Sequence, residues 1–295
     1  TAINIVHCQN CVANPIIKSM VLLNIRIYSM APVTTPAATS FLLLVMCLAS
    51  NSSLLPPKYE TACPVSHIIV ATDLSSIKKG DNILEIGCGW GGFSEFLAKN
   101  YDCQITALTI SREQFKFTTE RMEKANLTSK VKVVFCDYRN IKGQFDKVLS
   151  IEMFEAVGRE YWKTFFEKIK TILKPNGNVG LQLITIDDKI YNVYKNNPDF
   201  IQKYIFPGGM LPSVEVLKNI IENTSFRINS INSYSNDYAK TLNIWNKEFN
   251  RNWTKIEKLG FDERFKLLWN YYLSYCEGGF LSKNIDLKQI NLKLN

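Results

Sequence analysis

The sequence predicts an α/β fold in which a parallel sheet carries helices on both faces. From Asp73 onward, short apolar runs alternate with amphipathic segments, a pattern typical of successive strand–helix–strand units. The first apolar run leads directly into a glycine cluster, in the sequence NILEIGCGWGGF at 82–93. In such sheets a ligand binds at the carboxyl end of the first strand, where glycines let the backbone approach it and the next helix offers unpaired N–H groups.

The expected elements follow in order along the chain. The first strand is Asn82–Ile86, the turn is Gly87–Gly92, and the first helix begins at Phe93–Lys99. Further strands are expected at Gln104–Leu108, Val131–Phe135, Phe145–Ile151 and Val179–Ile186, and amphipathic helices at Arg112–Lys124 and Tyr161–Leu173. Lys174-Pro175-Asn176-Gly177 should end the last of these helices in a turn, because proline cannot continue a helix and glycine favours a turn.

Charge divides the chain near residue 73. The formal net charge is +8, which favours anionic partners such as nucleic acid or acidic lipid headgroups. Only four of the charged residues precede Asp73, namely Lys18, Arg26, Lys58 and Glu60. We therefore expect residues 1–72 to be an atypical leader, poorly ordered or non-native, and residues 73–295 to form the functional domain.

Two features of the leader suggest a function only weakly. Phe41–Leu48 is apolar but shorter than the roughly 20 residues of a membrane-spanning helix, and no basic residue lies in the ten positions before it, as a signal peptide requires. Cys8 and Cys11 have zinc-ligand spacing, but Cys63 and His67 lie too far away to complete a usual site. We expect neither export nor a metal site, and the scattered cysteines favour a reducing compartment.

Three features of the glycine region favour S-adenosylmethionine over a dinucleotide. Glu85 lies two residues before Gly87, where a carboxylate repels a pyrophosphate but accepts from a cationic amino-acid group. The second strand ends at Thr109, not at the acid that binds the ribose of a nicotinamide cofactor. After the third strand, Asp137 could accept from an adenine amino group while Tyr138 lies along the ring. Asp137 could instead cap a helix.

Several longer motifs occur in order along the chain. They are LEIGCGWGGF at 84–93, ALTISREQ at 107–114, QFDKVLSIEMFEAVG at 144–158, YIFPGGMLPS at 204–213, YAKTLNIW at 238–245 and YYLSYCEGGF at 271–280. They resemble cyclopropane-fatty-acyl-phospholipid synthases and the related mycolic-acid cyclopropane synthases and fatty-acid methyltransferases. The resemblance covers about residues 77–295. It implies a class I methyltransferase (Rossmann-like) fold with a seven-stranded sheet.

The resemblance also implies how the chain ends. The last two strands would be Phe226–Tyr234 and Asp286–Leu294, the final one antiparallel, with a helical insertion at about 238–278 between them. The insertion is rich in aromatic residues, and a stripe of them at helical spacing is more often core than binding surface. We therefore expect the following to be largely buried: Trp245, Phe249, Trp253 and Trp269.

The implied reaction transfers a methyl(ene) group from S-adenosylmethionine to the double bond of an unsaturated phospholipid acyl chain. The alkene attacks the methyl group, and the resulting carbocation loses a proton to a bound bicarbonate ion and closes to a cyclopropane. Such a site needs a dry cavity, aromatic faces near the cation and a base near the new methyl group.

Site residues are carried over by matching the motifs. The resemblance assigns Glu155 and Tyr238 to bicarbonate, Ile186 to a backbone contact and Cys276 to the edge of the pocket. The cofactor-binding set is then expected to be Glu85, Gly87, Gly89, Trp90, Gly91, Thr109, Ile110, Gln114, Asp137 and Tyr138, and no metal is expected. Glu155 could instead be a surface carboxylate and Tyr238 a core aromatic, but a carboxylate in the apolar run Ile151–Val157 is costly without a task.

The sequence departs from the family at two places. Some members carry a His at the position of Ile184, and Gln182 is a candidate substitute. A weakened base would let the cation form a methyl branch instead of a ring. The leader also lacks the family's Tyr-Ser-rich motif and lid helices. An amine methyltransferase of small molecules and a non-catalytic cofactor-binding remnant therefore stay open as alternatives.

The same reasoning gives partners and location. We expect the chain to act in a bacterial cytoplasm, peripherally on the inner membrane face, where anionic lipid attracts its positive charge. The expected partner is unsaturated phospholipid and not nucleic acid. A homodimer is left open.

Overall fold

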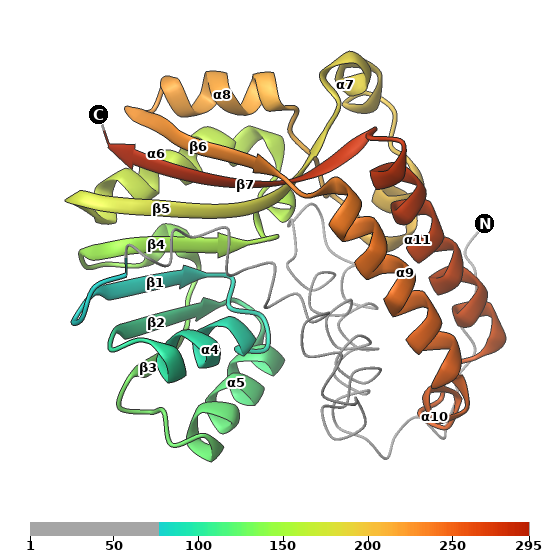
Figure 1. Ribbon diagram of the computed structural model, residues 1–295, viewed down its shortest axis with the longest axis horizontal. Helices are drawn as coiled ribbons and strands as arrows, with labels where there is room; N and C mark the ends of the chain where they lie inside the picture. The colour runs from blue at the N-terminus through green and yellow to red at the C-terminus, as the bar shows by residue number, and fades with distance from the viewer. Residues whose placement is uncertain (1–76, 295) are drawn as a thin grey trace.

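The computed structural model of the chain describes residues 77–294 (Figure 1). The expectations for the leader, including the apolar run at 41–48 and the pair Cys8 and Cys11, lie outside the described residues. Within residues 77–294 the cysteines are free thiols, at Cys88, Cys103, Cys136 and Cys276.

Seven strands form one mixed sheet in the order β3-β2-β1-β4-β5-β7-β6. Their bounds are β1 Asn82–Ile86, β2 Gln104–Thr109, β3 Val131–Phe135, β4 Phe145–Ile151, β5 Leu173–Ile186, β6 Phe226–Ser233 and β7 Ile285–Leu294. β1 to β5 run parallel, whereas β7 pairs antiparallel with both β5 and β6. The predicted α/β fold and its antiparallel final strand are confirmed.

Helices cover both faces of the sheet. They are α4 Gly92–Asn100, α5 Arg112–Lys124, α6 Trp162–Ile172 and α8 Val214–Glu222. On one face, Phe93 and Leu97 of α4 pack with buried residues of β1 and β2. On the other, Phe165 and Ile169 of α6 pack with β4 and with α8. Each helix buries an apolar stripe, as the helical spacing of its apolar residues predicts.

The turn predicted at residues 174–177 is wrong. The helix ends at Ile172, as expected within two residues, but β5 begins at once with Leu173. Phe145 pairs with Leu173 and Lys147 with Asn178, so four residues bulge out of the ladder. The proline and glycine therefore interrupt the pairing without ending the strand, as they do at bulges elsewhere.

A helical insertion lies between β6 and β7, as predicted. It consists of α9 Ser235–Arg251, α10 Trp253–Glu257 and α11 Glu263–Leu281. α9 and α11 pack side by side and extend beyond the carboxyl ends of the parallel strands (Figure 1). Three of the four aromatics expected there are buried, Phe249, Trp253 and Trp269, while Trp245 is partly buried against the same cluster.

The segment between β5 and β6 holds elements that the sequence analysis did not assign. Besides α8, they are α7 Asp188–Tyr194 and a short π-helix, Ile201–Ile205. The short helix Phe154–Ala156 after β4 was not assigned either. It is held by Phe154, which is buried and whose ring lies 5.6 Å from that of Trp162 and 5.2 Å from that of Phe165. This packing fixes the backbone of the neighbouring residues, which include Glu152 and Glu155.

Candidate functional site

The glycine turn after β1 has a backbone that other residues adopt with strain. The φ angles of Gly87, Gly89 and Gly91 are 82°, 54° and 79°, in the left-handed region that glycine tolerates. A Cβ on Gly87 would lie 2.7 Å from Met153 Cγ, and one on Gly91 would lie 2.5 Å from Thr118 Cγ2. Gly87 thus lets the turn pass close to the end of β4, while Gly91 lets α4 begin close to α5.

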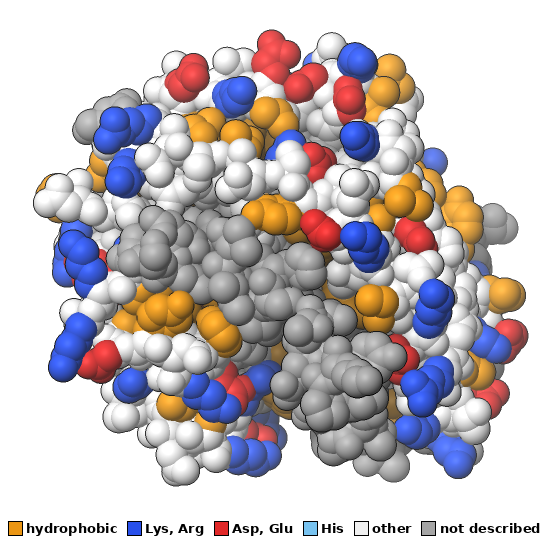
Figure 2. All heavy atoms as spheres, in the orientation of Figure 1, with side chains coloured by type: hydrophobic (Ala, Val, Ile, Leu, Met, Phe, Trp, Pro, Cys, Tyr) orange, Lys and Arg blue, Asp and Glu red, His pale blue; other side chains and the backbone are white. Residues whose placement is uncertain are grey.

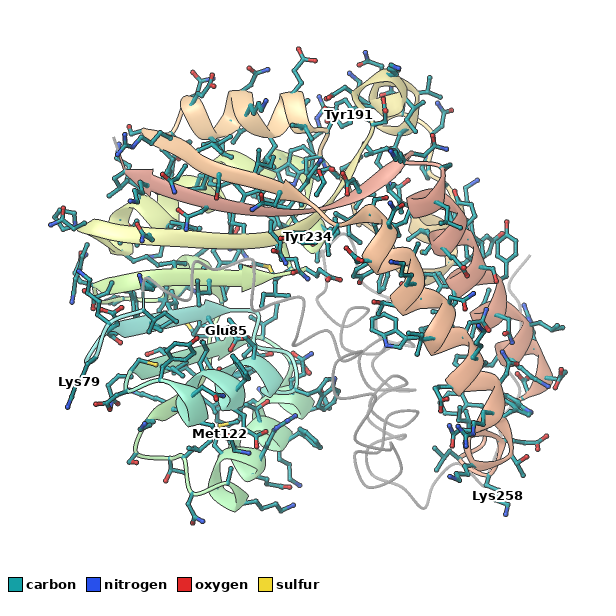
Figure 3. The ribbon with its side chains drawn as sticks, in the orientation of Figure 1. Lys79, Glu85, Met122, Tyr191, Tyr234 and Lys258 are labelled. Atoms are coloured by element: carbon teal, nitrogen blue, oxygen red, sulfur yellow. The ribbon has the colours of Figure 1, made fainter. Side chains whose placement is uncertain are left out.

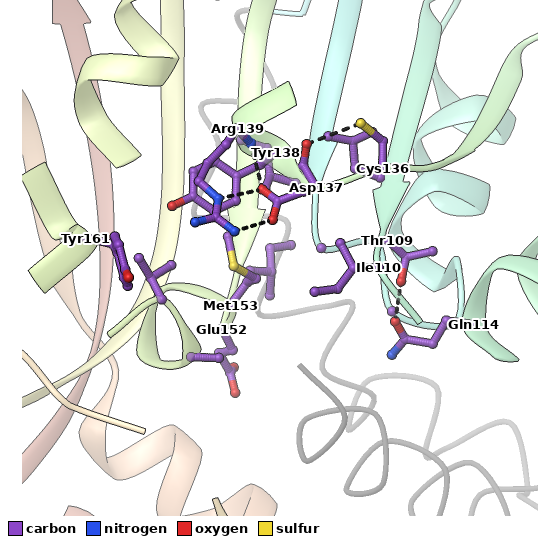
Figure 4. A pocket seen from close by; sticks show the side chains of 17 residues that line it. Thr109, Ile110, Gln114, Cys136, Asp137, Tyr138, Arg139, Glu152, Met153 and Tyr161 are labelled. Atoms are coloured by element: carbon purple, nitrogen blue, oxygen red, sulfur yellow. Dashed lines mark hydrogen bonds and ion pairs between the residues drawn. The ribbon is translucent and has the colours of Figure 1, made fainter. Parts of the chain in front are cut away.

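A cavity opens at the carboxyl ends of β1, β2 and β4 (Figure 4). The space inside it, part of which is open to solvent, is about 880 Å³. Seven of the ten expected cofactor residues line it: Gly87, Gly89, Thr109, Ile110, Gln114, Asp137 and Tyr138. The expected ligand-binding edge of the sheet is therefore a real pocket.

The other three expected cofactor residues do not line this cavity. Glu85 is buried in β1 and accepts a hydrogen bond from Ser94 Oγ of α4. Desolvation raises the pKa of Glu85 to about 7. Trp90 is buried, with its ring 5.1 Å from that of Phe117. Together with Gly91, these residues shape the turn and its packing, and a direct cofactor contact by them stays a prediction.

The wall formed by β2 is polar and neutral. Thr109 Oγ1 donates to Gln114 Oε1 at 2.6 Å and accepts from the backbone N–H of Ser111 at 3.1 Å. Ser111 also caps α5, with its hydroxyl accepting from the backbone N–H of Gln114. Ser111 and Thr109 thus hold Gln114 at the wall of the pocket. Neither they nor Gln114 carries a charge.

The wall that follows β3 carries an ion pair. Asp137 accepts from Arg139 Nε at 3.0 Å and from Arg139 Nη2 at 2.7 Å (Figure 4). The Arg139 guanidinium holds the pKa of Asp137 below its usual value. Asp137 also accepts from the backbone N–H of Arg139, so the capping interpretation is correct and coexists with a place in the pocket. Tyr138 packs edge-on against Phe165, with the ring centres 5.4 Å apart.

A pair of half-buried carboxylates, Glu152 and Glu155, lies just after β4. Glu152 lines the pocket and accepts from Tyr238 Oη at 2.6 Å and from Gln182 Nε2 at 2.7 Å. Glu155 Oε1 accepts from the backbone N–H of Ile184 at 2.6 Å. Its Oε2 is buried and has no hydrogen-bond partner among the described residues. Tyr238 is thus hydrogen-bonded to Glu152, and the charge of Glu152 acts on Glu155, while a shared role of Glu155 and Tyr238 in holding bicarbonate stays a prediction.

Burial and mutual repulsion set the protonation of this pair. Desolvation, and then the charge of Glu152, raise the pKa of Glu155 to about 8. Desolvation also raises the pKa of Glu152, but the hydrogen bonds from Tyr238 and Gln182 oppose that shift. Two neighbouring carboxyls titrate as a unit, and the better-solvated or better-bonded one ionises first. The hydrogen bonds to Glu152 therefore favour its ionised form, and the charge of Glu152 favours a protonated Glu155.

The remaining two residues of the expected catalytic set are Cys276 and Ile186, and they have different surroundings. Cys276, on α11, packs in the same aromatic cluster as Tyr238, and burial raises the pKa of its thiol to about 12. The backbone N–H of Ile186 donates to the carbonyl of Pro212 at 3.0 Å. The backbone donor that reaches the carboxylate pair is therefore that of Ile184, two residues earlier.

Glu152 and Arg139 were missed by sequence reasoning. Glu152 lies in the same apolar run as Glu155, so the argument that a carboxylate there needs a task applied to both. Arg139 follows Asp137 by two residues, a spacing that allows a side-chain pair in a tight turn. Gln182, considered as a substitute for the missing His, does reach the site, through Glu152.

Comparisons with known proteins agree with this geometry. The model of the mycolic acid cyclopropane synthetase family matches residues 65–290. A tuberculostearic acid methyltransferase of Mycobacterium tuberculosis is 37% identical over 221 residues, which are 75% of this chain and 52% of that protein. The cyclopropane-fatty-acyl-phospholipid synthase of Escherichia coli K12 is 37% identical over 214 residues, 72% of this chain and 53% of that protein. The chain spans about half the length of these relatives.

Solved structures show the same fold with a bound cofactor product. A crystal structure of a mycolic acid cyclopropane synthase, CmaA1, complexed with SAH (S-adenosylhomocysteine) and CTAB, superposes with a TM-score of 0.71 at 25% identity. The match covers 77% of this chain and 83% of that one. Among residues 77–294, no group of His, Cys, Asp and Glu side chains could hold a metal ion.

Proposed function

This chain belongs to the mycolic acid cyclopropane synthetase family of S-adenosylmethionine-dependent methyltransferases, and from that premise we propose its reaction. It transfers a methyl(ene) group from S-adenosylmethionine to the double bond of an unsaturated phospholipid acyl chain and forms a cyclopropane. The observation that carries this proposal is the hydrogen bond from buried Tyr238 to Glu152, which lines the pocket.

The pocket suits S-adenosylmethionine. Its glycine turn brings the backbone of Gly87 and Gly89 to the ligand, and neither it nor the neutral Thr109 wall offers a basic side chain for a pyrophosphate. Asp137 and Tyr138 lie together on another wall, where they would hold the adenine. The cofactor supplies an electrophilic methyl group on a sulfonium; the chain's residues bind it, orient it and exclude water.

The surroundings of Tyr238 suit a reaction that passes through a cation. Tyr238 is buried, with its ring centre 4.7 Å from that of Phe280 and 6.1 Å from that of Trp245. Aromatic faces stabilise a nearby positive charge, and a dry site keeps water from capturing it. Methylation of an amine needs neither feature, and the two relatives at 37% identity are named for fatty-acid and fatty-acyl substrates. Both points favour the acyl chain over a small amine.

The bicarbonate ion remains a prediction, and two features of the site oppose it. The Tyr238 hydroxyl that should hold the ion donates to Glu152 instead. An added anion would also lie beside the carboxyl group of Glu152, where two neighbouring negative charges cost free energy. The unpaired Glu155 Oε2 is a polar atom that could receive a ligand, but it does not by itself make an anion site. No step of the proposed reaction passes through bicarbonate.

We place the reaction at a membrane surface, peripherally on the cytoplasmic side. No helix within residues 77–294 has both the length and the apolar character needed to cross a bilayer. The net charge of +8 supports attraction to anionic headgroups. On the face shown in Figure 2, Lys and Arg side chains are interspersed with Asp and Glu and do not form one patch, so this attraction would be spread over the surface.

The test uses purified chain, vesicles of unsaturated phospholipid and S-adenosylmethionine with a fully deuterated methyl group. Ring closure removes one deuterium, so a cyclopropane product retains two and has lost its double bond. A methyl branch formed by loss of a different proton keeps all three deuterium atoms and the unsaturation. Cofactor binding without any lipid product would contradict the proposal and favour the remnant or the amine methyltransferase.

A further inference from the structure

Glu152 lies toward the end of the pocket where the methyl group would react. It lies at the carboxyl end of β4, which pairs with β1 beside the glycine turn. Figure 4 shows Glu152 at one end of the lining and the Asp137–Arg139 pair at the other. Because Asp137 is the expected adenine contact, Glu152 lies toward the end that would receive the methyl group.

A glutamate at position 152 costs free energy in two ways. Its φ angle is 49°, in the left-handed region where a side chain other than that of glycine is strained. Its carboxylate is also removed from water, which disfavours the ionised form. A glycine would relieve both costs. Strain and buried charge at one residue beside a pocket point to a chemical task.

Two donors hold the Glu152 carboxylate in place. Tyr238 binds Oε2 from the helical insertion, and Gln182 binds Oε1 from β5. Gln182 is itself oriented by Gln289 Nε2, which donates to its Oε1 at 2.9 Å. An ionised carboxylate has about four lone-pair sites, and these two bonds use only half of them. The group is therefore fixed in orientation but can still accept a proton.

Glu155 and Glu152 titrate as a coupled pair. The two carboxyls are close enough that the charge of Glu152 raises the pKa of Glu155. Because Tyr238 and Gln182 donate to Glu152 and favour its ionised form, the shared proton is favoured on Glu155 and the negative charge on the residue that lines the pocket. Glu155 is in this respect a positioning residue, because it acts through its neighbour.

From this geometry we infer that Glu152 is the base of the reaction and takes the proton for which the family uses a bound bicarbonate ion. The inference rests on the proposed function. The alkene π electrons form a bond to the cofactor's methyl carbon while the carbon–sulfur bond breaks and its electron pair stays on sulfur. Glu152 then takes a proton from the new methyl group, and the electrons of that C–H bond close the ring onto the cationic carbon. The products are cyclopropane, S-adenosylhomocysteine and a proton later released to solvent.

The first test compares Glu152→Gln with the wild-type chain in the deuterated-methyl assay. Gln has the same shape but is not a base, so ring closure should fall by about 100-fold or more, the usual contribution of a general base. S-adenosylmethionine binding, measured by calorimetry, should stay within a few-fold. Glu160→Gln, at an exposed position of the neighbouring helix, is the matched control and should leave both values unchanged.

A second variant tests whether the carboxylate itself is required. Glu152→Gly removes the side chain at a backbone angle that glycine adopts freely, so folding should be preserved. We expect ring closure to be lost and to be restored in part by added formate, which can supply a small carboxylate in the vacated space. Loss that formate does not restore, in a variant that still binds S-adenosylmethionine, would count against Glu152 as the base.

The wild-type rate of ring closure in buffer depleted of carbon dioxide distinguishes the two candidate bases, Glu152 and bicarbonate. A rate that is unchanged when bicarbonate is removed supports Glu152, and a rate that collapses and returns with added bicarbonate overturns the inference. Full ring closure by Glu152→Gln would overturn it as well. If the wild-type chain itself makes no lipid product, the proposed function has failed, which is a different result from either of these.

Discussion

The Tyr238 hydroxyl donates a 2.6 Å hydrogen bond to Glu152 Oε2 and so joins the helical insertion to the end of β4. The two residues are 86 positions apart in sequence. Figure 3 shows the insertion standing beside the sheet, so this contact lies where the two parts of the fold meet. This contact favours the ionised form of Glu152.

Removing the Tyr238 hydroxyl should weaken the base without emptying the pocket. In Tyr238→Phe the aromatic ring remains, but Glu152 loses a donor that favours its ionised form. We expect the pKa of Glu152 to rise, and the acidic limb of the pH–rate profile to move to higher pH, with a loss of about 10-fold or more at neutral pH. The pH dependence of turnover measures this shift directly.

Tyr271→Phe is the control for that substitution. Tyr271 lies on α11 of the same insertion, and it is 54% exposed. Loss of its hydroxyl should leave the pH–rate profile in place. Equal shifts in the two variants would mean that the Tyr238 hydroxyl does not act through Glu152.

Burial of Glu85 predicts a stability that falls as the pH rises. Its pKa is raised from an ordinary 4.5 to about 7, so the folded chain binds its proton more tightly than the unfolded chain does. The stabilising contribution is complete below pH 4.5 and is lost as the pH rises through 7. At about 1.4 kcal/mol per pKa unit, the loss for this group is about 3 kcal/mol.

Glu85→Gln should flatten this dependence, because an amide carries no charge to desolvate. We expect the variant to gain stability relative to the wild type between pH 5 and pH 8, measured by urea unfolding at each pH. Glu155 contributes in the same direction, since its pKa is raised to about 8, so a residual slope should remain. A wild-type slope that persists undiminished in Glu85→Gln would contradict the assignment to Glu85.

The local pattern of the sequence predicted most of the sheet. Asn82–Ile86, Val131–Phe135 and Phe145–Ile151 are apolar runs bounded by turn residues, and the structure has strands with these bounds. Helix α8 was missed although Ser213 caps it and Leu217 and Ile221 form its buried face. Its pattern is present in the sequence but short, and it lies in a segment without clear strand neighbours.

The site was predictable only in part, for a physical reason. Thr109 follows from the strand ends of a parallel sheet, whereas Gln114, in α5, was expected only from the family resemblance. The contact of Tyr238 with Glu152 depends on how α9 packs at the end of the sheet, which no local pattern specifies. The same holds for Ile184, whose backbone N–H reaches Glu155 because β4 and β5 are neighbours in the sheet.

Two glycines of the same turn, Gly87 and Gly92, allow a matched test. Gly87→Ala places a Cβ 2.7 Å from Met153 Cγ at a φ of +82°, so both strain and a clash oppose it. We expect a stability loss of about 1–3 kcal/mol and weaker S-adenosylmethionine binding. Gly92→Ala meets only Arg121 Nη1 at 3.9 Å, at the start of α4, and should be neutral or slightly stabilising. Similar losses in both would show that the turn does not require glycine at 87.

The Asp137–Arg139 pair should act as one unit in cofactor binding. Arg139 fixes the Asp137 carboxylate with two side-chain hydrogen bonds, and an aspartate that is held in this way can accept from an adenine amino group without reorienting. Asp137→Asn and Arg139→Gln should each weaken S-adenosylmethionine binding, by about 10-fold, and the double variant should be only slightly worse than either because the second change removes an interaction already lost. Calorimetric titration of the four proteins measures the coupling. Strictly additive losses would mean that Arg139 contacts the cofactor independently, and an unaltered affinity in Asp137→Asn would confine Asp137 to its role as a helix cap.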